Sequence, residues 1–174
     1  MSSERIGDKG MTSGGYGNVV SKISPFCNAV GTVDELQSVL GVARCFLDKT
    51  KEDYDTMIRD YQKTLSSLVC PVLLRISNGK TTPEDEMNLR KELEKLDSFI
   101  EKADIKFTGF IIPGDSHNPA SAQVHVGRSV CRRCERDITS FVSSFPSSPT
   151  INALLSFMNR SSLFLFHLAV SIDK

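Results

Sequence analysis

Three charged residues stand at spacings that place them on one face of a helix. Arg128, Arg132 and Glu135 lie at positions i, i+4 and i+7, which share one side of an α-helix. Two guanidinium groups on one face could bind a phosphate chain, since each presents a rigid fork of donors to anionic oxygens. The same spacing is also common on solvated helices with Glu/Arg pairs, so the pattern alone leaves both interpretations open.

The helix that carries these residues is expected over residues 119–142. Asn118 before Pro119 is typical of an N-cap followed by proline at the first helical position. Beside the charged face runs a stripe of small and apolar residues, formed by Gly127, Cys131, Cys134, Ile138 and Phe141. We expect this stripe to pack closely on another helix, with the charged face at the edge of the core or of a subunit contact.

The cysteine usage indicates an intracellular protein. We expect the cytoplasm or, if the protein is eukaryotic and its presequence has been removed, the mitochondrial matrix. The 21 basic and 21 acidic residues balance, which argues against a general binder of nucleic acid or of membrane surfaces. Five cysteines spread over the expected helices argue against a disulfide framework. We find no apolar leader and no apolar run that reaches the length of a membrane span, so no membrane anchor is expected.

Residues 1–25 form a Gly-rich segment with too little apolar content for a core element, and we expect loop or disorder there. Its glycines would allow backbone N–H groups to wrap an anion, but the spacing is not a Walker pattern, and a flexible tail is the simpler explanation of the composition. Residues 26–174 are expected to form a single helical domain.

Apolar residues at alternating spacings of three and four predict the helices of that domain. The first is expected over about 28–48 with Asn28 or Thr32 as cap, and the second over about 54–78, bent near Pro71. A third begins at Pro83 with a solvated charged face, and a fifth follows the loop 145–149. Only 107–112 resembles a strand. The fold class is therefore all-α: an up-and-down four-helix bundle with a fifth helix.

His125 with Cys131 and Cys134 also raises the hypothesis of a zinc or redox site. Zinc sites usually take four ligands, and a second cysteine pair is missing. Because both cysteines fall on the packing stripe, small core residues are the simpler interpretation. We expect no metal held by protein side chains.

Five segments in order resemble the PduO-type corrinoid adenosyltransferase family. They are GDKGMTS (7–13) with Ser21-Lys22, AVGTVDEL (29–36) with Gly41, FIIPG (110–114), RSVCRRCER (128–136), and MNRS (158–161). The resemblance implies transfer of the 5′-deoxyadenosyl group of ATP to cob(I)alamin, giving adenosylcobalamin and triphosphate. It implies a homotrimer of five-helix subunits with ATP and Mg²⁺ at each interface. It also implies a flavoprotein or other cobalamin reductase and an adenosylcobalamin-dependent recipient enzyme as partners.

The resemblance assigns a role to each matching residue. Asp34 and Arg128 would form a salt bridge across the subunit interface that orders the nucleotide and corrinoid pockets. Arg132 would contact the phosphates and Phe110 would lie under the corrin, so that these four residues carry catalysis. Further ATP contacts are implied for Glu135 at the adenosine end, for Asn159, and for the loop residues Gly7, Asp8, Gly10, Thr12, Ser13 and Lys22.

The chain departs from the family pattern mainly in the phosphate loop and in the fifth helix. Glu4, Arg5 and Ile6 stand where the family has T-x-T ahead of the glycine, and Val19 replaces a basic residue. Other departures are Gln37, Asp115 and Ser162. They motivate a second hypothesis, a non-catalytic homologue that binds or delivers cobalamin. A helical bundle with no ligand is a third class, which would leave the five segments unexplained.

Overall fold

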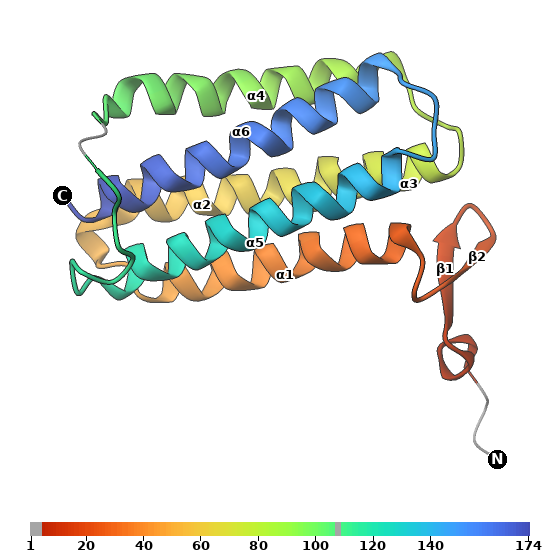
Figure 1. Ribbon diagram of the computed structural model, residues 1–174, viewed down its shortest axis with the longest axis horizontal. Coiled ribbons are helices and arrows are strands. Elements are labelled where there is room, and N and C mark those ends of the chain that lie inside the picture. The colour runs from red at the N-terminus through yellow and green to blue at the C-terminus, as the bar shows by residue number, and fades with distance from the viewer. Residues whose placement is uncertain (1–4, 107–108) are drawn as a thin grey trace.

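The computed structural model describes residues 5–106 and 109–174, and most of them are helical (Figure 1). The helices are α1 (Pro25–Cys45), α2 (Glu52–Thr64), α3 (Cys70–Ser77), α4 (Pro83–Ala103), α5 (Pro119–Val142) and α6 (Pro149–Ile172). With α2 and α3 counted as one rod, each helix runs opposite to the one before it (Figure 1). The expected up-and-down bundle with a fifth helix is confirmed. Glu4, a predicted departure from the family pattern, and residues 107–108 at the start of the strand-like stretch lie outside the described residues.

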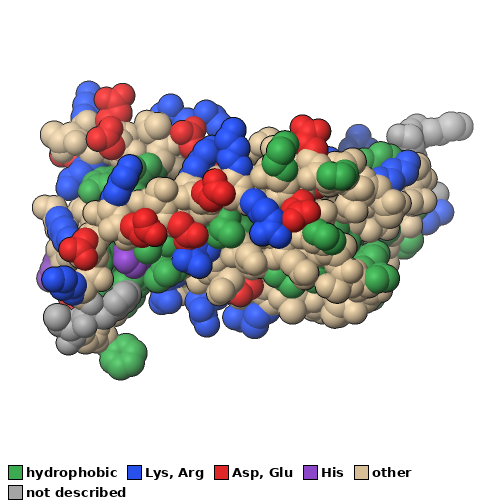
Figure 2. All heavy atoms as spheres, turned by 90° about the horizontal axis from the view of Figure 1, so that it is seen from above, with side chains coloured by type: hydrophobic (Ala, Val, Ile, Leu, Met, Phe, Trp, Pro, Cys, Tyr) green, Lys and Arg blue, Asp and Glu red, His purple; other side chains and the backbone are tan. Residues whose placement is uncertain are grey.

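Helix α5 lies at the centre of the packing. It contacts α1 on one side and α6 on the other, and α4 packs against α6. The face around α4 shows acidic and basic side chains interspersed without a field of one sign (Figure 2). This agrees with the expectation that the charged run of α4 is a solvated face.

The rod formed by α2 and α3 contains a π-helical turn, η3 (Leu65–Val69), just before Pro71. Proline lacks the N–H that would donate to the carbonyl of Ser67, and its ring crowds the preceding turn. A local widening of the helix accommodates both effects without ending the rod. The expected irregularity near Pro71 is therefore present as a wide turn.

Helices α1, α4, α5 and α6 each begin with proline at the first helical position. The predicted cap of α5 is confirmed, because the Asn118 side chain accepts hydrogen bonds from the backbone of Ala120 and Ser121 at 3.0 and 3.2 Å. The predicted cap of α1 is wrong. Ser24 caps that helix by accepting from the backbone of Cys27 at 3.3 Å, and Pro25 follows it.

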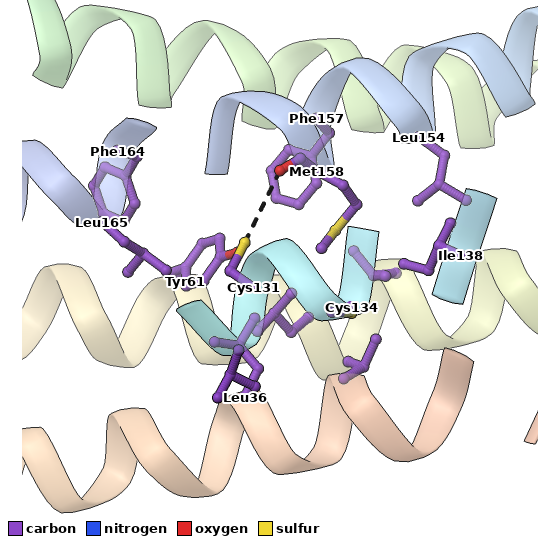
Figure 3. Close-up of a cluster of buried hydrophobic side chains, with 14 of the residues drawn as sticks. Leu36, Tyr61, Cys131, Cys134, Ile138, Leu154, Phe157, Met158, Phe164 and Leu165 are labelled. Carbon is purple, nitrogen blue, oxygen red and sulfur yellow. Dashed lines mark hydrogen bonds between the residues drawn. The ribbon is translucent and has the colours of Figure 1, made fainter. Parts of the chain in front are cut away.

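The predicted packing stripe of α5 is buried. A Cβ atom on Gly127 would lie 2.9 Å from Leu40 Cδ2, so the glycine allows α5 to approach α1 closely. The Cys131 thiol donates to the Met158 carbonyl over 3.9 Å and lies 4.0 Å from the Tyr61 hydroxyl (Figure 3). The stripe thus joins α5 to α1, α2 and α6.

Helix α6 corrects the expectation that no apolar run is long enough to cross a membrane. Among the described residues it alone has the length and mean hydropathy for a span. It is also packed against both α5 and α4, and 56% of its most apolar window is buried. The central helix of a bundle meets the same criteria, and its burial accounts for the apolar composition.

The Gly-rich segment is more ordered than expected. It contains a short 3₁₀ helix, η1 (Ile6–Lys9), and a hairpin of β1 (Met11–Gly15) and β2 (Asn18–Ser21) with antiparallel pairing. The Asn78 side chain at the end of α3 donates to the Gly14 carbonyl at 3.1 Å, which fastens the hairpin to the bundle. In contrast, the described part of the strand-like stretch, 109–112, is irregular.

Candidate functional site

The charged face of α5 is present as predicted. Arg132 is exposed, while Arg128 and Glu135 are half-buried beside it. Neither arginine forms an ion pair with any residue from 5–106 or 109–174. The Nε atom of Arg128 is buried without a hydrogen-bond partner among the same residues. The face therefore offers two guanidinium groups that no described residue of the chain neutralises, as an anion site requires.

Asn159 of α6 lies opposite the part of α5 around Cys131, at a similar position along the bundle axis. The Cys131 thiol donates to the carbonyl of Met158, the residue before Asn159, and this contact fixes the register of α6 against α5. The Asn159 side chain is exposed. The structure thus brings Asn159 near the level of Arg128 and Arg132.

Asp34 of α1 faces a different groove. It lines a hollow of about 400 Å³ together with Ser66 and Cys70, on the side of α1 that meets α3. Burial, with a smaller contribution from the Asp34 charge, raises the pKa of the Cys70 thiol to about 11. Within the described part of one chain, Asp34 and Arg128 form no ion pair.

The residues that directly follow Asp34 on α1 and Arg132 on α5 do contact each other within one chain. Glu35 of α1 forms an ion pair with Arg133 of α5, and this contact raises the pKa of the Arg133 guanidinium. Sequence reasoning missed this pair, although both residues belong to the segments quoted for the family. The available signal was that each directly follows a predicted site residue, Asp34 or Arg132.

The predicted phosphate loop is assembled around Lys22. The Lys22 ammonium donates to the Gly7 carbonyl at 2.9 Å, and its backbone N–H donates to the Gly10 carbonyl at 2.9 Å. Gly10 has a φ of 71°, a conformation that favours glycine. The Asp8 carboxylate accepts from the Arg5 backbone at 3.0 Å and so caps η1. Gly7, Asp8, Gly10 and Lys22 therefore lie together.

Thr12 and Ser13 continue from this loop into β1. The Ser13 hydroxyl accepts from the Gly15 backbone at 3.2 Å. Val19, which stands where the family has a basic residue, is 51% exposed on β2. The departure therefore removes a charge from the surface of the hairpin rather than from its packing.

Phe110 is fully exposed on the loop between α4 and α5. The neighbouring Ile111 and Ile112 are also exposed. This loop and the hairpin lie at opposite ends of the bundle (Figure 1). They are separated by the length of α5, about 36 Å for 24 residues. One chain alone therefore does not bring Phe110 to the phosphate loop.

The hypothesis of a zinc or redox site gains no support from the geometry. Cys131 and Cys134 are fully buried in the core, and burial raises the pKa of the Cys134 thiol to about 12. Metal ions bind the thiolate, which such burial disfavours. In the described ranges, no three side chains of His, Cys, Asp or Glu are grouped to hold a metal.

Comparison with known proteins adds the deciding observation. Residues 3–172 match a family model described as cobalamin adenosyltransferase. The chain is also 32% identical to the cobalamin adenosyltransferase of Cupriavidus metallidurans over 173 residues, covering 98% of this chain and 86% of that protein. The chain belongs to the cobalamin adenosyltransferase family.

Other members of the family are similar over nearly the whole chain. Identity is 30% to the bovine corrinoid adenosyltransferase MMAB, with 95% of this chain and 68% of that protein covered. It is 28% to PduO of Salmonella typhimurium, of which this chain spans only 48%. A variant of the Lactobacillus reuteri PduO-type enzyme, solved with ATP, aligns at 25% identity with a TM-score of 0.75, covering 94% of this chain and 88% of that one.

A second Lactobacillus reuteri variant, solved with cobalamin and ATP, aligns with a TM-score of 0.77 at 24% identity. It covers 94% of this chain and 86% of that one. These two alignments confirm the fold of the family for this chain. The comparisons establish the family and the fold, and the roles of individual side chains stay predictions.

Proposed function

We propose that this chain is an ATP:corrinoid adenosyltransferase that transfers the 5′-deoxyadenosyl group of ATP to cob(I)alamin. The observation that carries the proposal is the family match over residues 3–172, joined to a face of α5 whose arginines lack partners within the described chain. Members of the family that align here were solved with ATP and with cobalamin. An anion site at Arg128 and Arg132 is what the nucleotide requires.

The reaction is a nucleophilic displacement at carbon. The electron pair of Co(I) forms a bond to C5′ of ATP. The bond from C5′ to the triphosphate oxygen breaks, and triphosphate leaves with the electron pair of that broken bond. The protein has to hold C5′ in line and offset negative charge on the leaving chain. Arg132, with Arg128 nearby, supplies this offset, and Glu135 and Asn159 hold the nucleotide. The difficult chemistry belongs to the corrinoid, so no acid–base dyad is needed.

We place the site between copies of the chain, in a homotrimer. Asp34 opens toward α3 and is unpaired with Arg128 in one chain, so a second copy is the natural source of the partner carboxylate. The phosphate loop and the loop that carries Phe110 lie at opposite ends of one bundle, and they would meet only when neighbouring copies pack together. The Asp34–Arg128 bridge would then order the nucleotide and corrinoid pockets together.

Lys22 is the residue of the phosphate loop whose ammonium group would bind the phosphates of ATP. Without ligand its ammonium is satisfied by the Gly7 carbonyl at 2.9 Å. A triphosphate is a stronger acceptor than a neutral carbonyl, because hydrogen bonds between charged groups are stronger. Lys22 would therefore exchange this contact for the phosphates, and the backbone N–H groups of the loop would add further donors.

Phe110 would form the apolar wall beneath the corrin. Its side chain is fully exposed beside two exposed isoleucines, a patch that a large apolar ligand would cover. An apolar wall has no donor atom for cobalt, so it favours loss of the lower axial ligand. Loss of that ligand makes reduction to Co(I) easier.

Mg²⁺ would accompany the triphosphate rather than occupy a protein cage. Mg²⁺ in nucleotide sites is usually held by phosphate oxygens and water, with one or two protein ligands. The oxygen of Asn159 is the neutral ligand that could orient this shell. A cobalamin reductase and an adenosylcobalamin-dependent enzyme would supply and receive the corrinoid inside the cell, in the cytoplasm or mitochondrial matrix.

The test is anaerobic turnover with ATP, Mg²⁺ and chemically reduced cob(I)alamin. Adenosylcobalamin formation by absorbance and release of triphosphate should proceed together in equal amounts. The alternative, a cobalamin-binding or delivery homologue, is favoured by the altered loop residues Ile6 and Val19. Tight binding of cobalamin with neither product would overturn the enzyme and support that alternative.

A further inference from the structure

Two buried polar groups one turn apart on α5 lack hydrogen-bond partners in the described part of the chain. His125 is 4% exposed, and neither ring nitrogen has a hydrogen-bond partner among residues 5–106 and 109–174. The Nε atom of Arg128 is likewise buried and unpartnered there. Buried nitrogen atoms without partners are rare in proteins, so their occurrence three residues apart calls for an explanation.

The surroundings of His125 hold its ring in place. Phe166 of α6 meets it edge to face, with ring centroids 5.9 Å apart. Residues at i and i+3 share a helix face, which brings the ring and the Arg128 guanidinium together. Burial, and secondly the Arg128 charge, lower the pKa of His125 and outweigh the opposite effect of Asp173. The ring is therefore neutral near pH 7, and a neutral imidazole has one nitrogen that accepts a hydrogen bond.

We propose that His125 is the positioning residue for Arg128: an imidazole nitrogen accepts the Nε–H of Arg128 when its guanidinium turns to Asp34 of a second copy. One rotation of the arginine side chain then gives partners to two buried groups. It also directs the terminal N–H groups of Arg128 outward, where a carboxylate can accept two of them. This inference rests on the proposed function, because it takes the Asp34–Arg128 contact from that proposal.

His125→Phe tests the role because it keeps a flat ring and removes the acceptor. The matched control is His167→Phe on α6, whose imidazole is equally buried at 5% exposure. We expect His125→Phe to lower kcat/KM for cob(I)alamin about tenfold, a typical coupling between sites, without lowering the midpoint of thermal unfolding. His125→Gln or His125→Asn, which restore an acceptor at one ring position or the other, should recover part of the loss.

A double-mutant cycle with Arg128→Lys separates positioning from a general packing defect. Lysine keeps the charge but has no Nε–H in a guanidinium fork. If His125 acts through Arg128, His125→Phe should add no further loss in the Arg128→Lys background. Equal losses in both backgrounds, or normal kcat/KM in His125→Phe, would overturn the proposal.

Sedimentation measures the self-association of the same variants. It reports the coupling between His125 and Arg128 independently of turnover. His125→Phe should weaken association in the wild-type background and leave it unchanged in Arg128→Lys. An inactive wild-type protein that shows this coupling would refute the proposed function and leave the role of His125 standing. An active wild-type protein with additive effects in both measurements would refute the role of His125 alone.

Discussion

Glu35 and Arg133 form an ion pair that joins α1 to α5, and each directly follows a residue of the candidate site. Asp34 precedes Glu35, and Arg132 precedes Arg133. The pair thereby fixes the register of two helices that contribute to the proposed site from different sides. Both side chains are about half exposed, so the pair is placed to align helices more than to stabilise the fold.

Breaking this pair should therefore change catalysis more than stability. We expect Glu35→Gln to lower kcat/KM for ATP about tenfold, because small displacements of reacting groups are costly, with little change in the thermal midpoint. The charge swap Glu35→Arg with Arg133→Glu should restore part of the rate. Asp60→Asn, which breaks the exposed Lys63–Asp60 pair on α2, is the matched control. Equal rates for Glu35→Gln and the control would refute the alignment role.

Phe110→Ala should leave the fold intact and reduce turnover. The side chain is fully exposed in the single chain, so its removal exposes no core. Loss of the apolar wall should lower the rate of adenosylcobalamin formation from reduced cobalamin by at least about tenfold. Phe46→Ala removes another exposed phenylalanine, 53% exposed at the end of α1, and should have normal turnover. A normal rate in Phe110→Ala would contradict the assignment.

Stability should fall as the pH drops below neutral. Burial lowers the pKa of both His125 and His167 below the ordinary value of 6.5. The unfolded chain therefore takes up protons that the folded chain resists, so stability is full above pH 6.5 and is lost as pH falls through the lowered folded-state values. Urea unfolding at pH 7.5, 6.5 and 5.5 should show this loss, and His125→Phe should show less of it. A wild-type free energy that is flat over this range would contradict the buried, neutral state.

Gly127→Ala should destabilise the protein although alanine favours helices. The added methyl group would lie 2.9 Å from Leu40 Cδ2 at the contact of α1 and α5. Overpacking in a core costs about 1–3 kcal/mol, which exceeds the helix preference of alanine over glycine, about 1 kcal/mol. Gly41→Ala on α1 is the control, because its nearest atom would be 3.6 Å away, and it should stabilise. Equal unfolding midpoints for the two variants would count against the close approach.

The sequence predicted most of the bundle because its signals are local. The bounds of α5 follow from Asn118 and Pro119 at its start, and the burial of its stripe follows from helical spacing. The hairpin was missed because strands rich in glycine have little propensity of their own. Its order depends on tertiary contacts, such as that of the Asn78 side chain with Gly14, which no local pattern announces.

The sequence proposes the residues of the candidate site, but it could not give their arrangement. The charged face of α5 followed from spacing, and the resemblance supplied Asp34, Phe110 and Lys22. That Asp34 opens toward α3, away from Arg128, depends on how α1 is rotated in the bundle, and spacing alone could not fix it. The exposure of Phe110 at the end far from the hairpin likewise depends on topology.

The central claim is that each site combines Asp34 of one copy with Arg128 of another, and subunit mixing tests it most directly. Asp34→Ala and Arg128→Ala proteins should each be inactive in forming adenosylcobalamin from ATP and cob(I)alamin. After the two are unfolded together and refolded at equal amounts, about a quarter of the interfaces should carry both native residues. Recovery of about a quarter of the wild-type rate is the predicted result. A mixture that remains as inactive as its components would contradict a site shared between copies.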